Sequence, residues 1–123
     1  NVTASICNSN AATMFSSFYT DKKHIIAMYA STDGLYTSFG SEYDFLDYHT
    51  IITGQLTNLE TFKQAIVNNL TKRSRYGTED DISLSCVFDS DFLTEKESLI
   101  KEKIEENKKL AAERKAELLK KQV

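Results

Sequence analysis

Residues 77–85 read GTEDDISLS, and this stretch says most about the fold. Asp80 and Asp81 stand directly before the run Ile82–Phe88, in which apolar and polar side chains largely alternate. A period of two is typical of a strand that turns one face toward a core. A carboxylate at the end of such a strand is costly to bury unless a partner compensates its charge. The stretch therefore predicts a strand with an acidic group at its leading edge.

A second acidic signal lies earlier in the chain, at Asp33. It follows the nearly continuous apolar run Ile25–Ala30 and stands before Gly34. An Asp-Gly pair is also a common way of closing a strand in a turn, so this signal has a purely structural alternative. If the two acidic strand ends come together, their oxygens form the hard donor set that Mg²⁺ and Mn²⁺ prefer.

Both stretches resemble segments of the metal-dependent type 2C protein phosphatases. Ile25–Phe39 is similar to the strand-turn that carries "TDG" or "SDG" in that family. Arg75–Phe88 is similar to the closing "G-x-x-DD-[IN]-[ST]" segment, in which an aspartate opens the last core strand. The resemblance covers roughly residues 1–89. It implies an α+β fold, part of an α-β-β-α sandwich of two antiparallel sheets flanked by helices.

The resemblance also implies an activity and a set of ligands. The family hydrolyses phosphoserine and phosphothreonine with a metal-activated water, using Mn²⁺ or Mg²⁺, with two or more ions in the complete site. The matching positions assign Asp33 and Asp80 as metal ligands. Asp81 would order the loop, since adjacent side chains of an extended chain point to opposite faces. No side chain of this chain is assigned a direct catalytic role or the binding of another cofactor.

The family's first half, with its bridging aspartate-glycine pair and its phosphate-binding basic residue, has no counterpart here. The sequence has a single Asp-Gly pair, Asp33-Gly34, and it begins at Asn1. We therefore expect the C-terminal half of a protein serine/threonine phosphatase, inactive alone, whose partners are the missing N-terminal half and a phosphorylated protein substrate. The alternative is a non-catalytic, phosphatase-like regulatory or interaction module. An aspartate-glycine strand-turn upstream of Asn1 would favour the enzyme.

Charge divides the chain in two. The net charge of −3 gives no case for nucleic-acid or membrane binding, and no apolar run reaches the length of a membrane span, so we expect a cytoplasmic protein. In residues 94–123, 16 of 30 side chains are charged by count, too many for a domain core. We place a phosphatase-like domain at 1–92 and a charged helical tail at 93–123. The tail could be a coiled-coil arm that contacts another protein, or a solvated or docked helix.

Local patterns predict the remaining elements. Thr13–Ser31 is interpreted as a β-hairpin whose second strand is buried on both faces. Residues 43–52 have roughly helical spacing, with Gly54 as the cap beyond them. Capping boxes at 57–60 and 94–97 predict two further helix starts, and Gly77 should end the first of these helices.

Three groups of polar side chains have structural and functional readings. The basic cluster at 72–75 could attract a phosphorylated substrate, but it is also what a solvated helix end looks like. Cys7 and Cys86 could pair, but both lie in apolar runs, which favours buried thiols. For His24 and His49 the structural use is favoured, since neither falls in a family motif.

Overall fold

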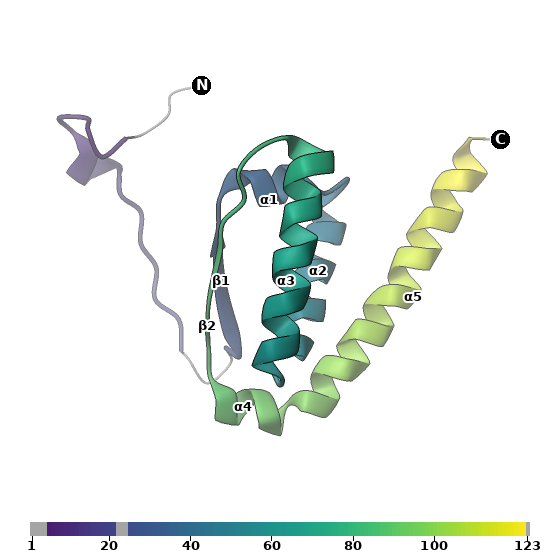
Figure 1. The fold of residues 1–123 in the computed structure, drawn as a ribbon. Coiled ribbons are helices and arrows are strands. Elements are labelled where there is room, and N and C mark those ends of the chain that lie inside the picture. Colours follow the sequence, from purple (N-terminus) through teal and green to yellow (C-terminus); the bar gives the residue numbers. More distant parts are fainter. Residues whose placement is uncertain (1–4, 22–24, 123) are drawn as a thin grey trace.

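The computed structural model describes residues 5–21 and 25–122, and their fold is mixed α+β with helices predominating. A two-stranded sheet is covered on one face by helices, and the N-terminal segment extends away on the other side (Figure 1). The elements in chain order are the 3₁₀ helix η1 (Ala11–Met14), β1 (Ala27–Ser31), α1 (Asp33–Thr37), α2 (Glu42–Gln55), α3 (Leu59–Arg73), the π-helical turn η3 (Ser74–Thr78), β2 (Leu84–Phe88), α4 (Ser90–Glu95) and α5 (Glu97–Lys121).

The two strands are antiparallel and far apart in the sequence. Ala27 lies opposite Phe88 and Ser31 opposite Leu84. Backbone bonds extend the pairing at both ends: the Asp89 N–H donates to the Ile26 carbonyl (3.0 Å), and the Thr32 N–H donates to the Ser83 carbonyl (3.1 Å). Helices α1 to α3 form the connection between the strands, so the sequence that follows β1 and the sequence that precedes β2 meet at one end of the sheet.

The strand at 84–88 agrees with its alternating pattern. Leu84, Cys86 and Phe88 are half-buried toward the helices, while Ser85 and Val87 are exposed. β1 behaves similarly, because Ala27 and Tyr29 are half-buried and Met28 is exposed. The prediction that this strand is buried on both faces is therefore wrong.

The predicted hairpin over Thr13–Ser31 is also wrong. Thr13 belongs to η1, residues 15–21 contain no strand, and β1 pairs with β2 instead. Part of the expected turn, with His24, lies outside the described residues. The turn pattern pointed to a strand partner that is close in sequence. The observed partner, β2, is distant in sequence, but the same helices cover the inner side chains of β1 and β2. Within residues 5–21 and 25–122 this two-stranded sheet is the only one, so a sandwich is not shown.

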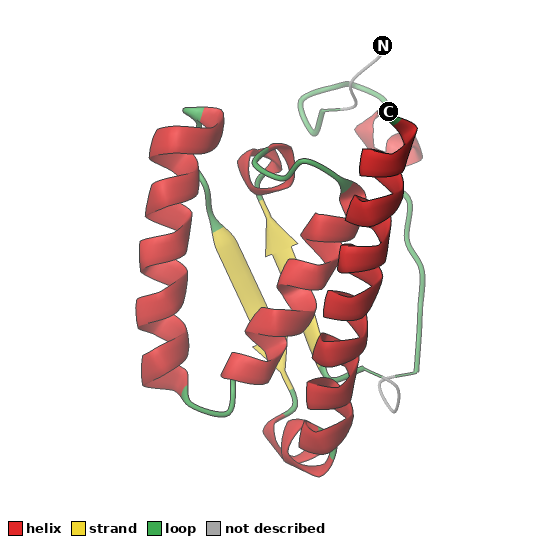
Figure 2. Cartoon of the chain, turned by 90° about the vertical axis from the view of Figure 1, so that its right-hand side faces the viewer, coloured by secondary structure: helices red, strands yellow, loops and turns green. Residues whose placement is uncertain are grey.

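Helices α2 and α3 lie side by side over the sheet, and α5 lies along the far side of α2 (Figure 2). Both inner helices begin with side-chain caps: Ser41 accepts a bond from the Asp44 N–H (3.2 Å), and Asn58 accepts one from the Thr61 N–H (3.1 Å). Residue 58, not 57, is thus the cap of α3.

Gly54 does not cap α2 as expected. It lies inside the helix, where a Cβ atom would come within 3.1 Å of Ile104 Cδ1 and 3.5 Å of Ile100 Cγ2 on α5. The missing side chain lets the two helices approach closely.

The core forms where α2, α4 and α5 meet. Leu56, Leu93 and Ile100 are at most 7% exposed and pack with half-buried side chains of both strands. Asp89 caps α4 by accepting a bond from the Phe92 N–H (3.0 Å), so the helical region begins before the capping box expected at 94–97. The domain boundary near residue 93 stays a prediction. Leu93 and Ile100, which lie in the predicted tail, belong to the core of the described structure.

Two further expectations concern the cysteine thiols and membrane-spanning segments. Cys7 is exposed, contrary to expectation, while Cys86 is half-buried, and both are free. In the described part of the chain, no helix combines the length and the apolar character needed to cross a membrane.

Candidate functional site: an acidic edge of the sheet

The structure brings the two acidic signals together at one end of the sheet. We use the name acidic edge for Asp33, Asp80 and Asp81, all of which are exposed. Asp33 is the first residue of α1, and Thr32 alone separates it from the end of β1. Asp80 and Asp81 lie between η3 and β2.

Thr32 joins the two segments through its side chain and its backbone. Its hydroxyl donates to the Asp81 carbonyl (3.3 Å) and accepts from the Ser83 N–H (3.0 Å). Its backbone N–H donates to the Ser83 carbonyl (3.1 Å). Thr32 therefore fixes the backbone of the edge, and its hydrogen bonds go to main-chain groups.

Gly34 allows a close approach between the segments. It is buried, and a Cβ atom at this position would lie 2.8 Å from the Asp81 carbonyl oxygen and 3.5 Å from Asp80 Oδ2. The first distance is shorter than a carbon–oxygen contact permits, so the glycine is required by the approach itself. Since Gly34 follows Asp33 directly, the chain segments that carry Asp33 and Asp80 meet at this point.

A tight turn presents Asp80. The Ser74 hydroxyl donates to the Asp80 carbonyl (2.7 Å), and the Asp80 N–H donates to the Thr78 hydroxyl (3.2 Å). Glu79 has φ 56°, a left-handed conformation that is uncommon for residues other than glycine. Non-glycine residues with such backbone angles cluster at functional sites, and π-helical turns such as η3 do so as well.

The neighbouring carboxylates have different surroundings. Asp80 Oδ1 accepts a bond from the Asp81 N–H (2.9 Å), while Oδ2 faces Gly34. Asp81 instead lines a groove with Ser74 and Arg75. Of the two, Asp80 is thus the residue whose carboxylate faces the Asp33 segment.

Arg73 packs against an aromatic cluster next to the acidic edge. The Arg73 guanidinium lies 3.8 Å from the ring centre of Phe39 and 5.1 Å from that of Tyr48, and it donates to the Ser38 hydroxyl (3.3 Å). This stacking ties the C-terminal end of α3 to the loop after α1. Burial raises the pKa of Tyr48, and the positive charge of Arg73 opposes that rise. The sequence showed Arg73 only as part of a basic run, because stacking across 34 positions has no local signal.

His49 has structural contacts, as its position on α2 suggests. Its Nδ1 donates to the Phe45 carbonyl (2.7 Å), and its ring packs edge-on against Tyr29 at 5.1 Å between ring centres. The Thr53 hydroxyl donates to the His49 carbonyl (2.7 Å), so the Tyr29 hydroxyl must be the donor in its 2.7 Å bond to Thr53. Burial raises the pKa of Tyr29.

The donor set fits part of a site for a hard cation. Aspartate oxygens suit Mg²⁺ and Mn²⁺, and Mg²⁺ is commonly held through one or two protein carboxylates. Among the described residues, no group of three or more His, Cys, Asp or Glu side chains is arranged to hold a metal. Asp33 and Asp80 could therefore supply some ligands, and other ligands would have to come from elsewhere.

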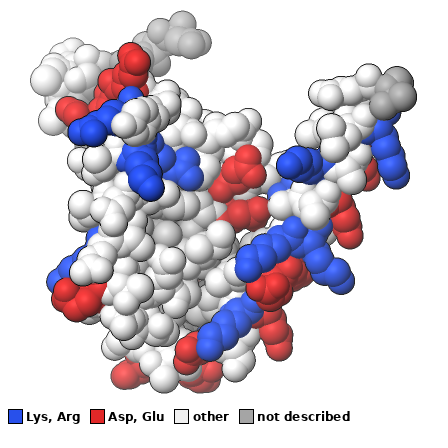
Figure 3. All heavy atoms as spheres, turned by 45° about the vertical axis from the view of Figure 1, so that its right-hand side comes forward, with Lys and Arg blue, Asp and Glu red and all other residues white. Residues whose placement is uncertain are grey.

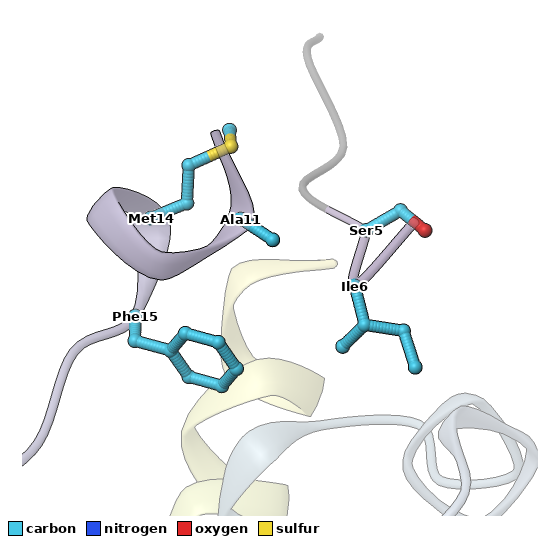
Figure 4. A pocket seen from close by; sticks show the side chains of 5 residues that line it. All are labelled: Ser5, Ile6, Ala11, Met14 and Phe15. Carbon is cyan, nitrogen blue, oxygen red and sulfur yellow. The ribbon is translucent and has the colours of Figure 1, made fainter. Parts of the chain in front are cut away.

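Two other hollows lack the chemistry of the acidic edge. One lies in the N-terminal segment between η1 and residues 5–6, and its lining carries no ionisable side chain (Figure 4). The other lies between β1, α2 and the start of α5, and it is largely apolar, with residues such as Ile26, Leu46 and Leu99.

Comparisons with known proteins leave the family open. No family model matches the sequence, and neither the curated proteins nor the solved structures contain a match.

Proposed function

We propose that this chain supplies part of the metal site of a phosphomonoester hydrolase that acts on phosphoserine and phosphothreonine, similar to the type 2C protein phosphatases. The observation that carries the proposal is the close approach of Gly34 to Asp80 and Asp81. Two acidic segments that resemble the family's metal-binding segments, far apart in sequence, meet at one end of the β1–β2 pair. The finer fold, a sandwich of two sheets, belongs to the same proposal.

In this proposal Asp33 and Asp80 hold a divalent cation, Mn²⁺ or Mg²⁺. When bound, such a cation offers Lewis acidity to the phosphate oxygens and makes an attacking water more acidic. The residues of this chain hold the two acidic segments together: Thr32 fixes the backbone on both sides, and the Ser74–Asp80 bond fixes the turn. Remaining ligands and a basic group for the phosphate would come from a further segment, so we do not expect this chain alone to hydrolyse phosphate esters.

The test is Mn²⁺ binding to this chain, which is measured through the electron paramagnetic resonance signal of the free ion. Asp33→Asn and Asp80→Asn should each weaken binding by at least about tenfold, since even changes around a ligand cost about 10–100-fold. Asp81→Asn, a matched control one residue away, should be milder. Equal effects of Asp80→Asn and Asp81→Asn, or Mn²⁺ binding that is unchanged by Asp33→Asn, would contradict the proposal.

A hydrolysis assay then separates the enzyme from a metal-binding module. It requires a protein in which this sequence is joined to an upstream segment with an aspartate-glycine strand-turn. Hydrolysis of p-nitrophenyl phosphate in the presence of Mn²⁺ should fall at least about tenfold on Asp33→Asn. Unchanged hydrolysis in that variant would exclude Asp33 as a ligand.

A further inference from the structure

A groove leads from the acidic edge along the C-terminal part of α3. We call it the α3 groove, and its lining includes Leu70, Thr71, Ser74, Arg75, Asp81 and Ile82. Leu70 and Ile82 are half-buried and give it an apolar base, while Ser74, Arg75 and Asp81 give it polar walls. Ser74, which lines the groove, donates its hydroxyl to the Asp80 carbonyl (2.7 Å), so the groove lies next to the turn that carries Asp80.

The basic side chains at this end of α3 fall into two kinds. Arg73 is committed to Phe39, Ser38 and Asn69, as described for the aromatic cluster. Lys72 and Arg75 are exposed, and in the part of the chain that the structure describes neither forms an ion pair. Arg75 lines the α3 groove and also the neighbouring hollow that Lys72 and Tyr76 line. The two cations thus face adjoining open hollows, and Asp81, the acidic side chain in their lining, forms no ion pair with either of them among the described residues.

We propose that Arg75 and Lys72 bind acidic side chains next to the phosphorylated residue of a peptide substrate, with the peptide lying in the α3 groove. The inference rests on the proposed function, which places the phosphate at the acidic edge. Carboxylates at the edge would repel an acidic peptide, but a bound divalent cation offsets that charge. Arginine then pairs with a carboxylate through its fixed fork of donors. The preferred substrate is therefore an acidic phosphopeptide.

The experiment measures peptide binding to the full chain with Mn²⁺ present, by fluorescence anisotropy. One labelled peptide carries a phosphothreonine followed by several glutamates, and its partner has glutamines at the same places. Arg75→Gln and Lys72→Gln should each weaken binding of the glutamate peptide by about 1.4- to 5-fold, the range for exposed ion pairs. The glutamine peptide should bind all variants equally. Lys63→Gln is the matched control, because Lys63 lies on the same helix and already pairs with Glu60 (3.7 Å).

Two results would overturn the inference: no change in any variant, or equal losses for the two peptides, which would place the cations on the phosphate itself. Removing Mn²⁺ tests the underlying function separately. If each peptide binds as tightly without Mn²⁺ as with it, the metal proposal fails. If Arg75→Gln still weakens binding of the glutamate peptide under those conditions, the acidic-peptide site stands. Weaker binding of the glutamate peptide at high salt should accompany the positive result, since exposed charges are screened.

Discussion

Gly34 is the residue at which the two acidic segments come closest. Its buried position beside the Asp81 carbonyl leaves no room for a side chain. An ordinary Asp-Gly turn would use glycine for its backbone angles, but no glycine among the described residues has positive φ. The requirement at Gly34 is therefore space, and it is set by a segment far away in the sequence.

Gly34→Ala should destabilise the protein and loosen the acidic edge. The added methyl group meets a backbone oxygen at 2.8 Å, so the loop with Asp80 and Asp81 must move. Overpacking of this kind costs about 1–3 kcal/mol, partly offset by the better helix propensity of alanine. Urea unfolding should show the loss, and Mn²⁺ binding should weaken in parallel.

Gly40→Ala is the control for this prediction. A Cβ atom at residue 40 would meet its nearest neighbour, Asp44 Oδ2, at 3.8 Å, an ordinary contact. If Gly34→Ala proves as stable as Gly40→Ala and binds Mn²⁺ equally well, the close approach does not organise the edge.

At the scale of elements, one hydrogen bond connects β1 to α2. Tyr29 on the strand donates to Thr53 on the helix, in a half-buried setting beside His49 and Cys86. Burial raises the pKa of Tyr29, and burial also raises the pKa of the Cys86 thiol. Burial between the sheet and the helix thus favours the neutral form of both groups.

The free energy of unfolding should therefore decrease at alkaline pH. A group whose pKa is raised in the folded state stabilises fully below its unfolded pKa, and this contribution is lost as the pH rises toward the folded value. The ordinary values are 9.0 for the thiol and 10.0 for the phenol, so the free energy of unfolding should fall from about pH 9 upward. Urea titrations across pH 7–11 would measure it.

Tyr29→Phe checks the assignment to this bond. At pH 7 the free energy of unfolding of the variant should be lower by about 0.5–1.5 kcal/mol, because the hydrogen bond is lost. Above pH 10 its free energy of unfolding should fall less steeply than that of the unaltered protein. Tyr76→Phe, at an exposed position, should leave the free energy at pH 7 unchanged. A steep alkaline loss that persists in Tyr29→Phe would point to other groups.

At the scale of the whole molecule, α5 has two unlike parts. Ile100 is buried in the core, and Ile104 packs beside Gly54. Farther along, Arg114 pairs with Asp47 on α2 (3.2 Å), and beyond it Leu118 and Leu119 are more than half exposed. Charges of both signs alternate along the outer surface of this helix (Figure 3).

Two truncations should separate these parts. Removing residues 116–123 should leave the thermal midpoint nearly unchanged, because no core side chain is lost. Removing 97–123 takes away Ile100, whose truncation to alanine alone would cost about 2–5 kcal/mol, a large share of the stability of a small domain. Circular dichroism during heating would compare the two chains. An unaltered midpoint for the chain ending at residue 96 would support the boundary near residue 93.

How much the sequence predicted depends on the reach of each interaction. The helices at 42–55 and 59–73 and the strand at 84–88 are predicted from periodicity, which involves neighbouring residues. The side-chain caps Ser41 and Asn58 emerge only from the structure, since the sequence predicts the capping box at 57–60. Gly54 shows where local reasoning ends. The local pattern predicts a helix cap at Gly54. In the structure Gly54 lies inside α2, where its lack of a side chain allows α5 to pack closely.

By itself, the sequence determined the types of most elements and the two acidic strand ends, because hydrogen bonds within a few residues specify these. Tertiary structure alone decided that β1 pairs with β2, that Gly34 meets Asp80, and that Arg73 stacks on Phe39. A local turn for residues 20–23 was equally compatible with the sequence, as the failed hairpin shows. The choice between such alternatives depends on which pairing buries the inner side chains of both strands under the same helices, and that free energy belongs to the assembled molecule.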